Sequence, residues 1–219
     1  MAMKLVSLLS GGKDSTYSTY LAQREGYEVR DAIIFVPETD SYMFHRPNAS
    51  QAVKIAEAMG LKPILWKTKG IKEMELEDLK KALKSVDADG VIAGAIASKY
   101  QFERVKRICD SLGLETYTPL WGRNQVEIMR EMISEGFKIM VVSVSAYGLG
   151  EEWLGRIIDE NALNELIEIE GKYRINVSGE GGEYETMVID GPNFSRPLRY
   201  EIVKKVWKRD YGWIEVNLH

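Results

Sequence analysis

Residues 8–15, L-L-S-G-G-K-D-S, join an apolar segment of the chain to a polar one. The segment before them, residues 4–9, is short and rich in Val and Leu, which predicts a buried strand, and residues 16–24 have helical spacing. Glycines between a strand and a helix let backbone N–H groups approach an anion, which the helix N-terminus also attracts. The stretch therefore predicts an anion-binding loop.

Each residue of this loop has a candidate part in holding a phosphate group. Gly11 and Gly12 lack Cβ, so we expect positive φ angles and accessible N–H groups there. Lys13 would add a mobile positive charge, and Asp14 or Ser15 would cap the helix. The Walker pattern needs four residues between its glycines and a Ser or Thr after its lysine, whereas here the glycines are adjacent and an aspartate follows the lysine. The loop is therefore not a Walker loop.

Strands and helices are expected to alternate over the first half of the chain. The patterns predict strands at residues 29–36, 63–66 and 90–97, and helices at 52–59, 72–84 and 98–112. Such alternation is typical of a parallel, doubly wound sheet with right-handed crossovers. The expected fold class of this half is α/β.

The second half changes character after Pro119, Gly122 and Asn124, a cluster of turn-forming residues. We expect a nucleotide-binding α/β domain at residues 1–122 and a smaller C-terminal α+β substrate-recognition domain at 123–219. The second domain should hold a helix at 126–133, a strand at 137–144 that would let the first sheet continue, a helix at 153–166, and an antiparallel hairpin formed by 198–207 and 213–218.

The end of the strand at 90–97 is a second candidate site. Gly94 and Ala95 lie where open α/β sheets bind ligands. A glycine there either lets a nucleotide lie against the backbone or makes room for a packed helix, and the sequence leaves both open. Tyr100, Gln101 and Arg104 follow at the start of the next helix, where Arg104 would reach a phosphate or carboxylate.

A third candidate site is residues 179–191, G-E-G-G-E-Y-E-T-M-V-I-D-G. Glu180, Glu183 and Glu185 crowd six positions, and like charges so close destabilise a fold unless they meet a cation or ligand. If strand pairing begins at Glu183, the last two glutamates share one face of the strand. The alternative is a solvated hairpin loop with incidental acidic residues.

The amino-acid composition and net charge indicate which class of protein to expect. The 219 residues are 45% hydrophobic and 28% charged, with a net charge of -4, so no broad basic surface for nucleic acid is expected. We find no segment typical of a membrane span or signal peptide, which predicts a cytoplasmic protein.

Cys109 is the single cysteine and lies in an apolar helical pattern, so we expect a buried structural thiol. His45 falls in a turn-rich segment after the second strand, where it would touch nucleotide or substrate; the alternative is an incidental loop histidine.

Residues 10–15, S-G-G-K-D-S, resemble the PP-loop of the ATP pyrophosphatases. Three further blocks occur in order, namely G-A-I-A-S-K-Y-Q-F-E-R-V at 94–105, P-L-W-G at 119–122 and E-G-G-E-Y-E-T at 180–186. Together the blocks span almost the whole chain, which resembles the diphthine–ammonia ligase family of PP-loop enzymes. The chain is similar to the short archaeal members, without the long C-terminal extension of eukaryotic ones.

The resemblance implies a Rossmann-like fold of the HUP type and an ATP-dependent amidation. The carboxylate of diphthine, on elongation factor 2, would be adenylated and then converted by ammonia to the amide of diphthamide, with AMP and pyrophosphate released. The residues implied for ATP are Ser10, Gly11, Gly12, Lys13, Asp14, Ser15, Gly94, Ala95 and Arg104, with Lys13 and Asp14 catalytic and Asp14 holding Mg²⁺. The residues implied for substrate are His45, Tyr100, Gln101, Glu180, Gly181, Gly182, Glu183, Tyr184 and Glu185.

Some functional questions stay open at this stage. The quaternary ammonium group of diphthine would meet the glutamates by charge and Tyr184 or a nearby Trp by cation–π contact. Free ammonia is the simpler nitrogen source, since a glutaminase needs a reactive cysteine. A homodimer is one expected assembly. The competing functions are a PP-loop RNA-modifying enzyme and a non-catalytic module that binds adenine nucleotides.

Overall fold

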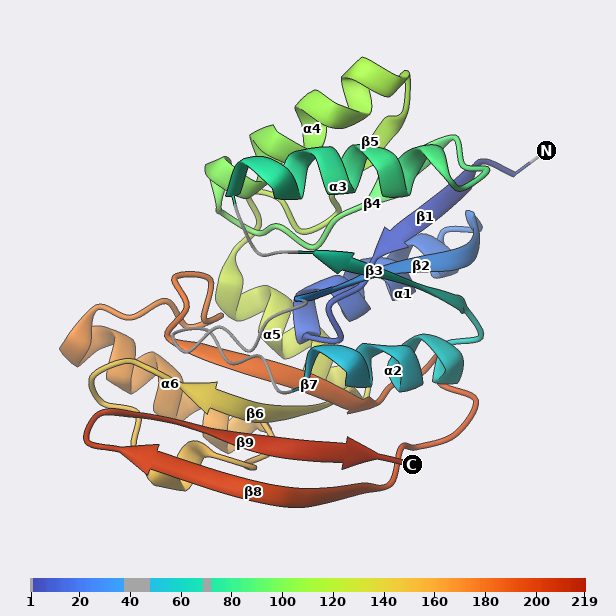
Figure 1. Cartoon of the computed structure of the whole chain (residues 1–219). Helices are drawn as coiled ribbons and strands as arrows, with labels where there is room; N and C mark the ends of the chain where they lie inside the picture. Colours follow the sequence, from blue (N-terminus) through green and yellow to red (C-terminus); the bar gives the residue numbers. More distant parts are fainter. Residues whose placement is uncertain (1, 38–47, 69–71) are drawn as a thin grey trace. The chain divides into compact units, whose positions relative to one another are not determined.

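The computed structural model describes residues 2–37, 48–68 and 72–219, which form two compact units, Met1–Trp121 and Gly122–His219. Strands and helices alternate along the first unit (Figure 1). Its elements are β1 (Lys4–Leu8), α1 (Lys13–Arg24), β2 (Glu28–Pro37), the short 3-10 helix η1 (Ala49–Gln51), α2 (Ala52–Ala58), β3 (Lys62–Thr68), α3 (Lys72–Lys84), β4 (Gly90–Ile92), α4 (Lys99–Leu112) and β5 (Glu115–Tyr117).

The five strands of this unit form one parallel sheet in the order β3-β2-β1-β4-β5. The chain moves outward from β1 in one direction to β3 and then returns to the other side of β1 at β4. Open α/β sheets bind ligands at the carboxyl ends of the two strands where this reversal occurs. The expected doubly wound, Rossmann-like sheet is confirmed, and the loops after β1 and β4 meet its switch point.

Helices cover both faces of this sheet (Figure 1). Successive residues of a strand point to opposite faces, so one strand serves two cores. Val6 of β1 packs with Leu83 of α3 and Cys109 of α4 on one face. Its neighbour Leu5 packs with Ala22 of α1 on the other face. Both cores hold β1 rigidly, and β1 in turn positions the loop that follows it.

Cys109 is fully buried in the core that α4 shares with the sheet. Burial raises the pKa of its thiol because the thiolate would be poorly solvated there. The thiol is not in a disulfide. The expected buried structural thiol is confirmed.

Strand β5 was not expected from the sequence, which indicated only turns after residue 114. The strand has three residues and no fully buried side chain, so no hydrophobic period marks it. Its parallel pairing with β4, which places Gly90 opposite Glu115, makes it a strand. A Cβ on Gly90 would lie 2.8 Å from Leu5 Cδ2 and 3.0 Å from the Glu115 carbonyl oxygen, so the glycine lets the strands lie close.

The second unit has a sheet of its own. Its elements are α5 (Gln125–Ser134), β6 (Lys138–Val144), the short 3-10 helix η2 (Glu151–Trp153), α6 (Glu160–Tyr173), β7 (Tyr184–Asp190), β8 (Tyr200–Lys208) and β9 (Tyr211–Leu218). The strands pair antiparallel in the order β7-β6-β9-β8. The expected β8–β9 hairpin is confirmed. No helix among the residues that the structure describes is long and apolar enough to cross a membrane.

Two expectations for this unit are wrong. The first sheet does not continue into β6, because β6 pairs antiparallel with β7 and β9, and an apolar run cannot reveal the direction of its partners. The helix expected at 153–166 begins only at Glu160. Asp159 is its N-cap and accepts a 2.8 Å hydrogen bond from the backbone N–H of Ala162.

Candidate active site

The loop after β1 leads directly into helix α1. The helix begins at Lys13, so Gly12 is its N-cap, in an extended conformation (φ -75°, ψ 166°). The expected cap by Asp14 or Ser15 is wrong, because both residues already lie in the first turn of the helix. A glycine has no side chain with which to bond the first N–H groups of the helix. No side chain of the N-cap residue therefore competes with an anion at this end of the helix.

Gly11 is required by conformation and by packing. It is the only one of the two loop glycines with a positive φ, +80°, whereas positive φ was expected at both. A Cβ on Gly11 would lie 2.8 Å from Ile55 Cδ1 and 3.3 Å from Ala52 Cβ of α2. Any larger residue would therefore strain the backbone and push against α2.

Two serines close the loop upon itself. The hydroxyl oxygens of Ser10 and Ser15 lie 3.0 Å apart, and Ser15 Oγ also accepts a 3.2 Å hydrogen bond from the Ser10 backbone N–H. Ser15 Oγ lies 3.2 Å from the Gly12 carbonyl oxygen, to which it donates. These bonds give the loop a defined shape before any ligand binds.

Lys13 is buried, which corrects the expectation of a mobile positive charge. Its side chain is only 4% exposed, and Nζ lies 2.9 and 2.7 Å from the two carboxylate oxygens of Asp14, which is 24% exposed. Burial beside a carboxylate holds the ammonium group in one place. The loop therefore carries a positive charge in a fixed position, next to the first turn of α1.

The loop after β4 packs against the first turn of α1. A Cβ on Gly94 would lie 2.6 Å from Ser15 N and 2.7 Å from the Asp14 carbonyl carbon. No side chain fits in that space, so Gly94 makes room for the first turn of α1, one of the two interpretations that the sequence left open. Ala95 is buried beside it, and Arg104 is half-buried on α4.

Asp14 is a candidate metal ligand beside the loop. Among the residues that the structure describes, no three His, Cys, Asp or Glu side chains are grouped to hold a metal. Mg²⁺ in phosphate sites commonly takes one or two carboxylates together with phosphate oxygens and water, and Asp14 offers one carboxylate. Asp14 would fit that pattern once the Lys13 ammonium group binds another partner in place of the Asp14 carboxylate.

The glycine-rich segment of the second unit is held by hydrogen bonds. Glu183 Oε1 accepts from the backbone N–H of Asn176 at 2.8 Å and from its side-chain Nδ2 at 2.7 Å. Strand β7 begins at Tyr184, one residue after the start on which the expected shared face of Glu183 and Glu185 depended, although the Ser145 backbone N–H still donates to the Glu183 carbonyl. Glu183 is half-buried and Glu185 is exposed. Glu183 therefore fastens the segment, while Glu180, also half-buried, and Glu185 lie on either side of it.

Tyr184 has a structural role. Its side chain is buried, and its hydroxyl donates a 2.5 Å hydrogen bond to the Val177 carbonyl oxygen. A Cβ on Gly179 would lie 3.1 Å from two carbons of the Tyr184 ring. The ring packs inside the unit, so the expectation that Tyr184 offers a face for cation–π contact is wrong.

Three residues that the sequence analysis missed support this segment. Gln125 of α5 accepts through Oε1 from Ser178 N at 3.2 Å and from Ser178 Oγ at 2.8 Å. Ser145, just after β6, donates from N to the Glu183 carbonyl at 2.8 Å and from Oγ to the Gly182 carbonyl at 2.6 Å. Gln125 and Ser178 are 53 residues apart, so no local pattern signals their contact.

We expect Asn176→Asp to destabilise the protein by about 1–3 kcal/mol near pH 7. In this variant a carboxylate oxygen replaces the amide nitrogen that donates to Glu183 Oε1 at 2.7 Å. Two negatively charged carboxylates then face each other. Their repulsion raises the pKa of one carboxyl group, and a proton restores the bond as the pH falls. The loss in urea unfolding free energy should therefore shrink toward pH 5. Asn164→Asp, at an exposed position of α6, is the control. An equal loss at both pH values would contradict the role given to Glu183.

His45 lies outside the residues that the structure describes. Tyr100 and Gln101 belong to the first turn of α4, but their side chains are not among those described. Their expected contacts with substrate therefore stay predictions.

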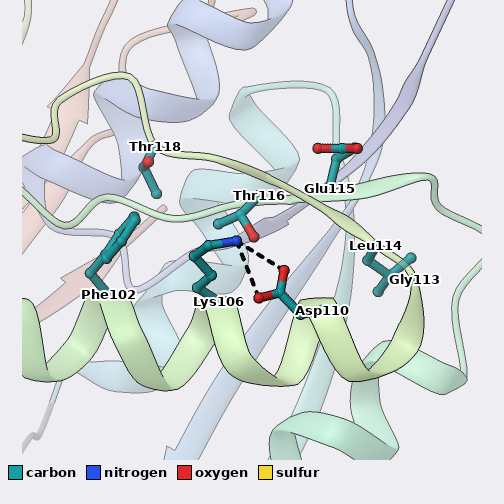
Figure 2. Close-up of a pocket in the computed structure, with 8 residues that line it drawn as sticks. All are labelled: Phe102, Lys106, Asp110, Gly113, Leu114, Glu115, Thr116 and Thr118. Atoms are coloured by element: carbon teal, nitrogen blue, oxygen red, sulfur yellow. Dashed lines mark hydrogen bonds and ion pairs between the residues drawn. The ribbon is translucent and has the colours of Figure 1, made fainter.

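A separate pocket of about 390 Å³ lies between α4 and β5 (Figure 2). Phe102 and Lys106 project from α4 toward the segment that carries Thr116 and Thr118, and Lys106 pairs with Asp110 at 2.9 and 3.2 Å (Figure 2). Among the residues described, its lining is Phe102, Lys106, Asp110, Gly113, Leu114, Glu115, Thr116 and Thr118. None of the candidate site residues whose side chains the structure describes is in this lining.

Both units match a known family. The N-terminal domain of diphthamide synthase matches residues 3–116, and the C-terminal domain matches residues 124–219. Similar curated proteins are named diphthine–ammonia ligase. The human protein is 35% identical over 90% of this chain and 82% of its own length, and the zebrafish protein is 34% identical over 98% and 93%. The Saccharomyces cerevisiae protein is 31% identical over 88% of this chain and 33% of its own length.

These matches agree in name and cover most of the chain. A solved structure described as a predicted subunit of a tRNA methyltransferase from Methanocaldococcus jannaschii is also similar, with a TM-score of 0.49, 17% identity, and coverage of 87% of this chain and 98% of its own. The family assignment rests on the sequence matches alone: this chain belongs to the diphthamide synthase family of carbon–nitrogen ligases, whose curated members are named diphthine–ammonia ligase.

Proposed function

We propose that this protein is the ATP-dependent ligase that converts diphthine on elongation factor 2 to diphthamide, with ammonia as the nitrogen donor. Family membership supports the reaction class. The observation that carries the proposal is the close packing of Gly94, in the loop after β4, against the first turn of α1. This packing supports an anion site at the N-terminus of α1, at the switch point of a parallel sheet.

The proposed reaction has two steps. A carboxylate oxygen of diphthine attacks the α-phosphorus of ATP, the bond to the β-phosphate oxygen breaks, and pyrophosphate leaves. Ammonia then attacks the acyl carbon, loses a proton, and displaces AMP to give the amide. A free carboxylate is unreactive toward ammonia because its leaving group would be oxide, so the first step supplies the leaving group.

The loop after β1 would stabilise the charge that grows on the leaving pyrophosphate. The N–H groups of Gly11 and Gly12 and the first turn of α1 would donate to phosphate oxygens. Lys13 would exchange the Asp14 carboxylate for phosphate, because a bound nucleotide brings more negative charge than one carboxylate. Asp14, released from the pair, would hold Mg²⁺, which supplies charge neutralisation to the phosphates when bound.

The other candidate ATP residues have more limited parts. Ser10 and Ser15 already bond each other, so they would shape the loop first and donate to phosphate second. Gly94 would act by its close packing on the helix, with Ala95 beside it. Arg104, half-buried on α4, would reach a phosphate of the nucleotide.

The second unit would recognise the protein acceptor. Glu180 and Glu185 would attract the quaternary ammonium group of diphthine, and Gly181 and Gly182 would let the acceptor approach the backbone. Glu183 would act through Asn176, by holding the segment in shape. Because the thiol of Cys109 is buried, it is unsuited to release ammonia from glutamine, and free ammonia is the proposed donor.

Pyrophosphate release tests the proposal. The protein would be incubated with ATP, Mg²⁺ and ammonium, with and without elongation factor 2 that carries diphthine, while mass spectrometry follows the acceptor. Exchange of a hydroxyl for an amino group should lower the acceptor mass by about 1 Da, with one AMP formed per amide. Release of pyrophosphate with RNA in place of the elongation factor would favour an RNA-modifying enzyme, and ATP binding without any release would favour a non-catalytic module.

A further inference from the structure

Two neighbouring tyrosines of the second unit are exposed to solvent. Tyr147 is 79% exposed, more than any other large hydrophobic side chain among the residues described, and Tyr173, at the end of α6, is 51% exposed. Their ring centroids lie 6.5 Å apart, with 32° between the ring planes. Two large aromatic rings exposed together are unusual on a protein surface unless they bind something.

The backbone between the two tyrosines keeps them together. Gly148, with φ +91°, follows Tyr147, and a Cβ on it would lie 2.5 Å from Cδ2 of the Tyr173 ring and 2.8 Å from Ile169 Cγ2. The segment that carries Tyr147 therefore rests directly on α6 and on Tyr173. The pair is a fixed feature of the unit, held by a glycine for which no other residue would fit.

Each tyrosine lies close in sequence to a residue that bonds the glycine-rich segment. Tyr147 comes two residues after Ser145, which donates to the carbonyl groups of Gly182 and Glu183 at 2.6 and 2.8 Å. Tyr173 comes three residues before Asn176, which donates twice to Glu183 Oε1. Each tyrosine is therefore within three residues, along the chain, of a residue that bonds the glutamate-bearing segment.

This combination suits a quaternary ammonium group. Such a cation cannot donate hydrogen bonds, so proteins bind it through aromatic rings, within about 6 Å of a ring centroid, and through nearby carboxylates. Since the two centroids are 6.5 Å apart, one cation can meet that distance for both rings. Lys172 and Arg174, on either side of Tyr173, are exposed.

We propose that Tyr147 and Tyr173 form the subsite for the quaternary ammonium group of the acceptor, in the unit that also carries Glu180. This inference rests on the proposed function, because it names the part of the site that reads the acceptor. Tyr147 and Tyr173 make the cation–π contacts that the buried ring of Tyr184 cannot make.

Binding of tetramethylammonium tests the subsite without turnover. Titration of the intact protein, followed by NMR signals of the tyrosine rings, should show shifts at Tyr147 and Tyr173, and tert-butanol, a neutral group of similar shape, should produce smaller ones. Tyr147→Ala should weaken tetramethylammonium binding by about tenfold, and Tyr147→Phe should not. Equal shifts with both probes, or no shift at the two rings, would overturn the proposal.

Kinetics with the diphthine acceptor give the second readout. Tyr147→Ala and Tyr173→Leu should raise KM for the acceptor by about tenfold, with kcat and KM for ATP little changed. Tyr200→Ala, at a tyrosine of β8 that is 44% exposed, is the matched control. If amidation proceeds equally well in Tyr147→Ala, the subsite is wrong and the function stands. If the unaltered protein amidates nothing while tetramethylammonium still binds the pair, the function is wrong and the cation subsite stands.

Discussion

Lys13→Met is expected to reduce pyrophosphate release by at least about a hundredfold, the effect of removing one preorganised group that stabilises developing charge. The ammonium group of Lys13 is buried at the start of α1 and held at 2.7 Å by Asp14, so water cannot replace it well. Methionine fills a similar volume without the charge. Its loss leaves Asp14 without this counterion, and the free carboxylate would repel the phosphates of ATP.

The measurement for Lys13 is the rate of pyrophosphate release together with the affinity for ATP. Lys54→Met is the matched control, because Lys54 of α2 is half-exposed and pairs only loosely with Glu57, at 3.4 Å. Urea unfolding of both variants would separate lost chemistry from lost stability. If Lys13→Met kept its rate within about threefold, the loop after β1 would not be the phosphate site.

Gly94→Ala is expected to destabilise the protein by about 1–3 kcal/mol and to weaken ATP binding at the same time. The added methyl carbon would lie 2.6 Å from Ser15 N, which is backbone and cannot rotate away. The first turn of α1 would have to move, and with it the N–H groups that we assign to the phosphates. One added methyl group should therefore lower both the free energy of unfolding and the affinity for ATP.

Gly171→Ala provides the comparison for Gly94→Ala. Gly171 lies in α6, and no atom of the described residues, apart from its chain neighbours and its own helix backbone, lies within 4 Å of the position of an added Cβ. That substitution should stabilise the protein by about 0.5–1 kcal/mol, the usual gain of alanine over glycine in a helix. Urea unfolding and ATP titration would be done on both variants. Unchanged ATP affinity in Gly94→Ala would show that the loop after β4 does not support the nucleotide site.

Local patterns were enough to predict the strand, loop and helix of residues 4–24. A glycine pair after an apolar run and before a helical period is decided by backbone conformation within a few residues. The same kind of signal predicted the alternation of the first unit and the hairpin of the second. Residues 10–15 and 180–186 also carried the resemblance to the family, since both blocks are continuous in sequence.

Contacts between distant segments were decided only by the tertiary structure. Whether Gly94 faces a nucleotide or a helix depends on where α1 lies, and the pairing of β6 depends on β7 and β9. The partner of Ser178 is a glutamine 53 residues away, and Tyr147 meets Tyr173 across a whole helix. Local sequence sets the conformation and the exposed face of an element, whereas its neighbours follow from how the whole chain packs, which no short stretch encodes.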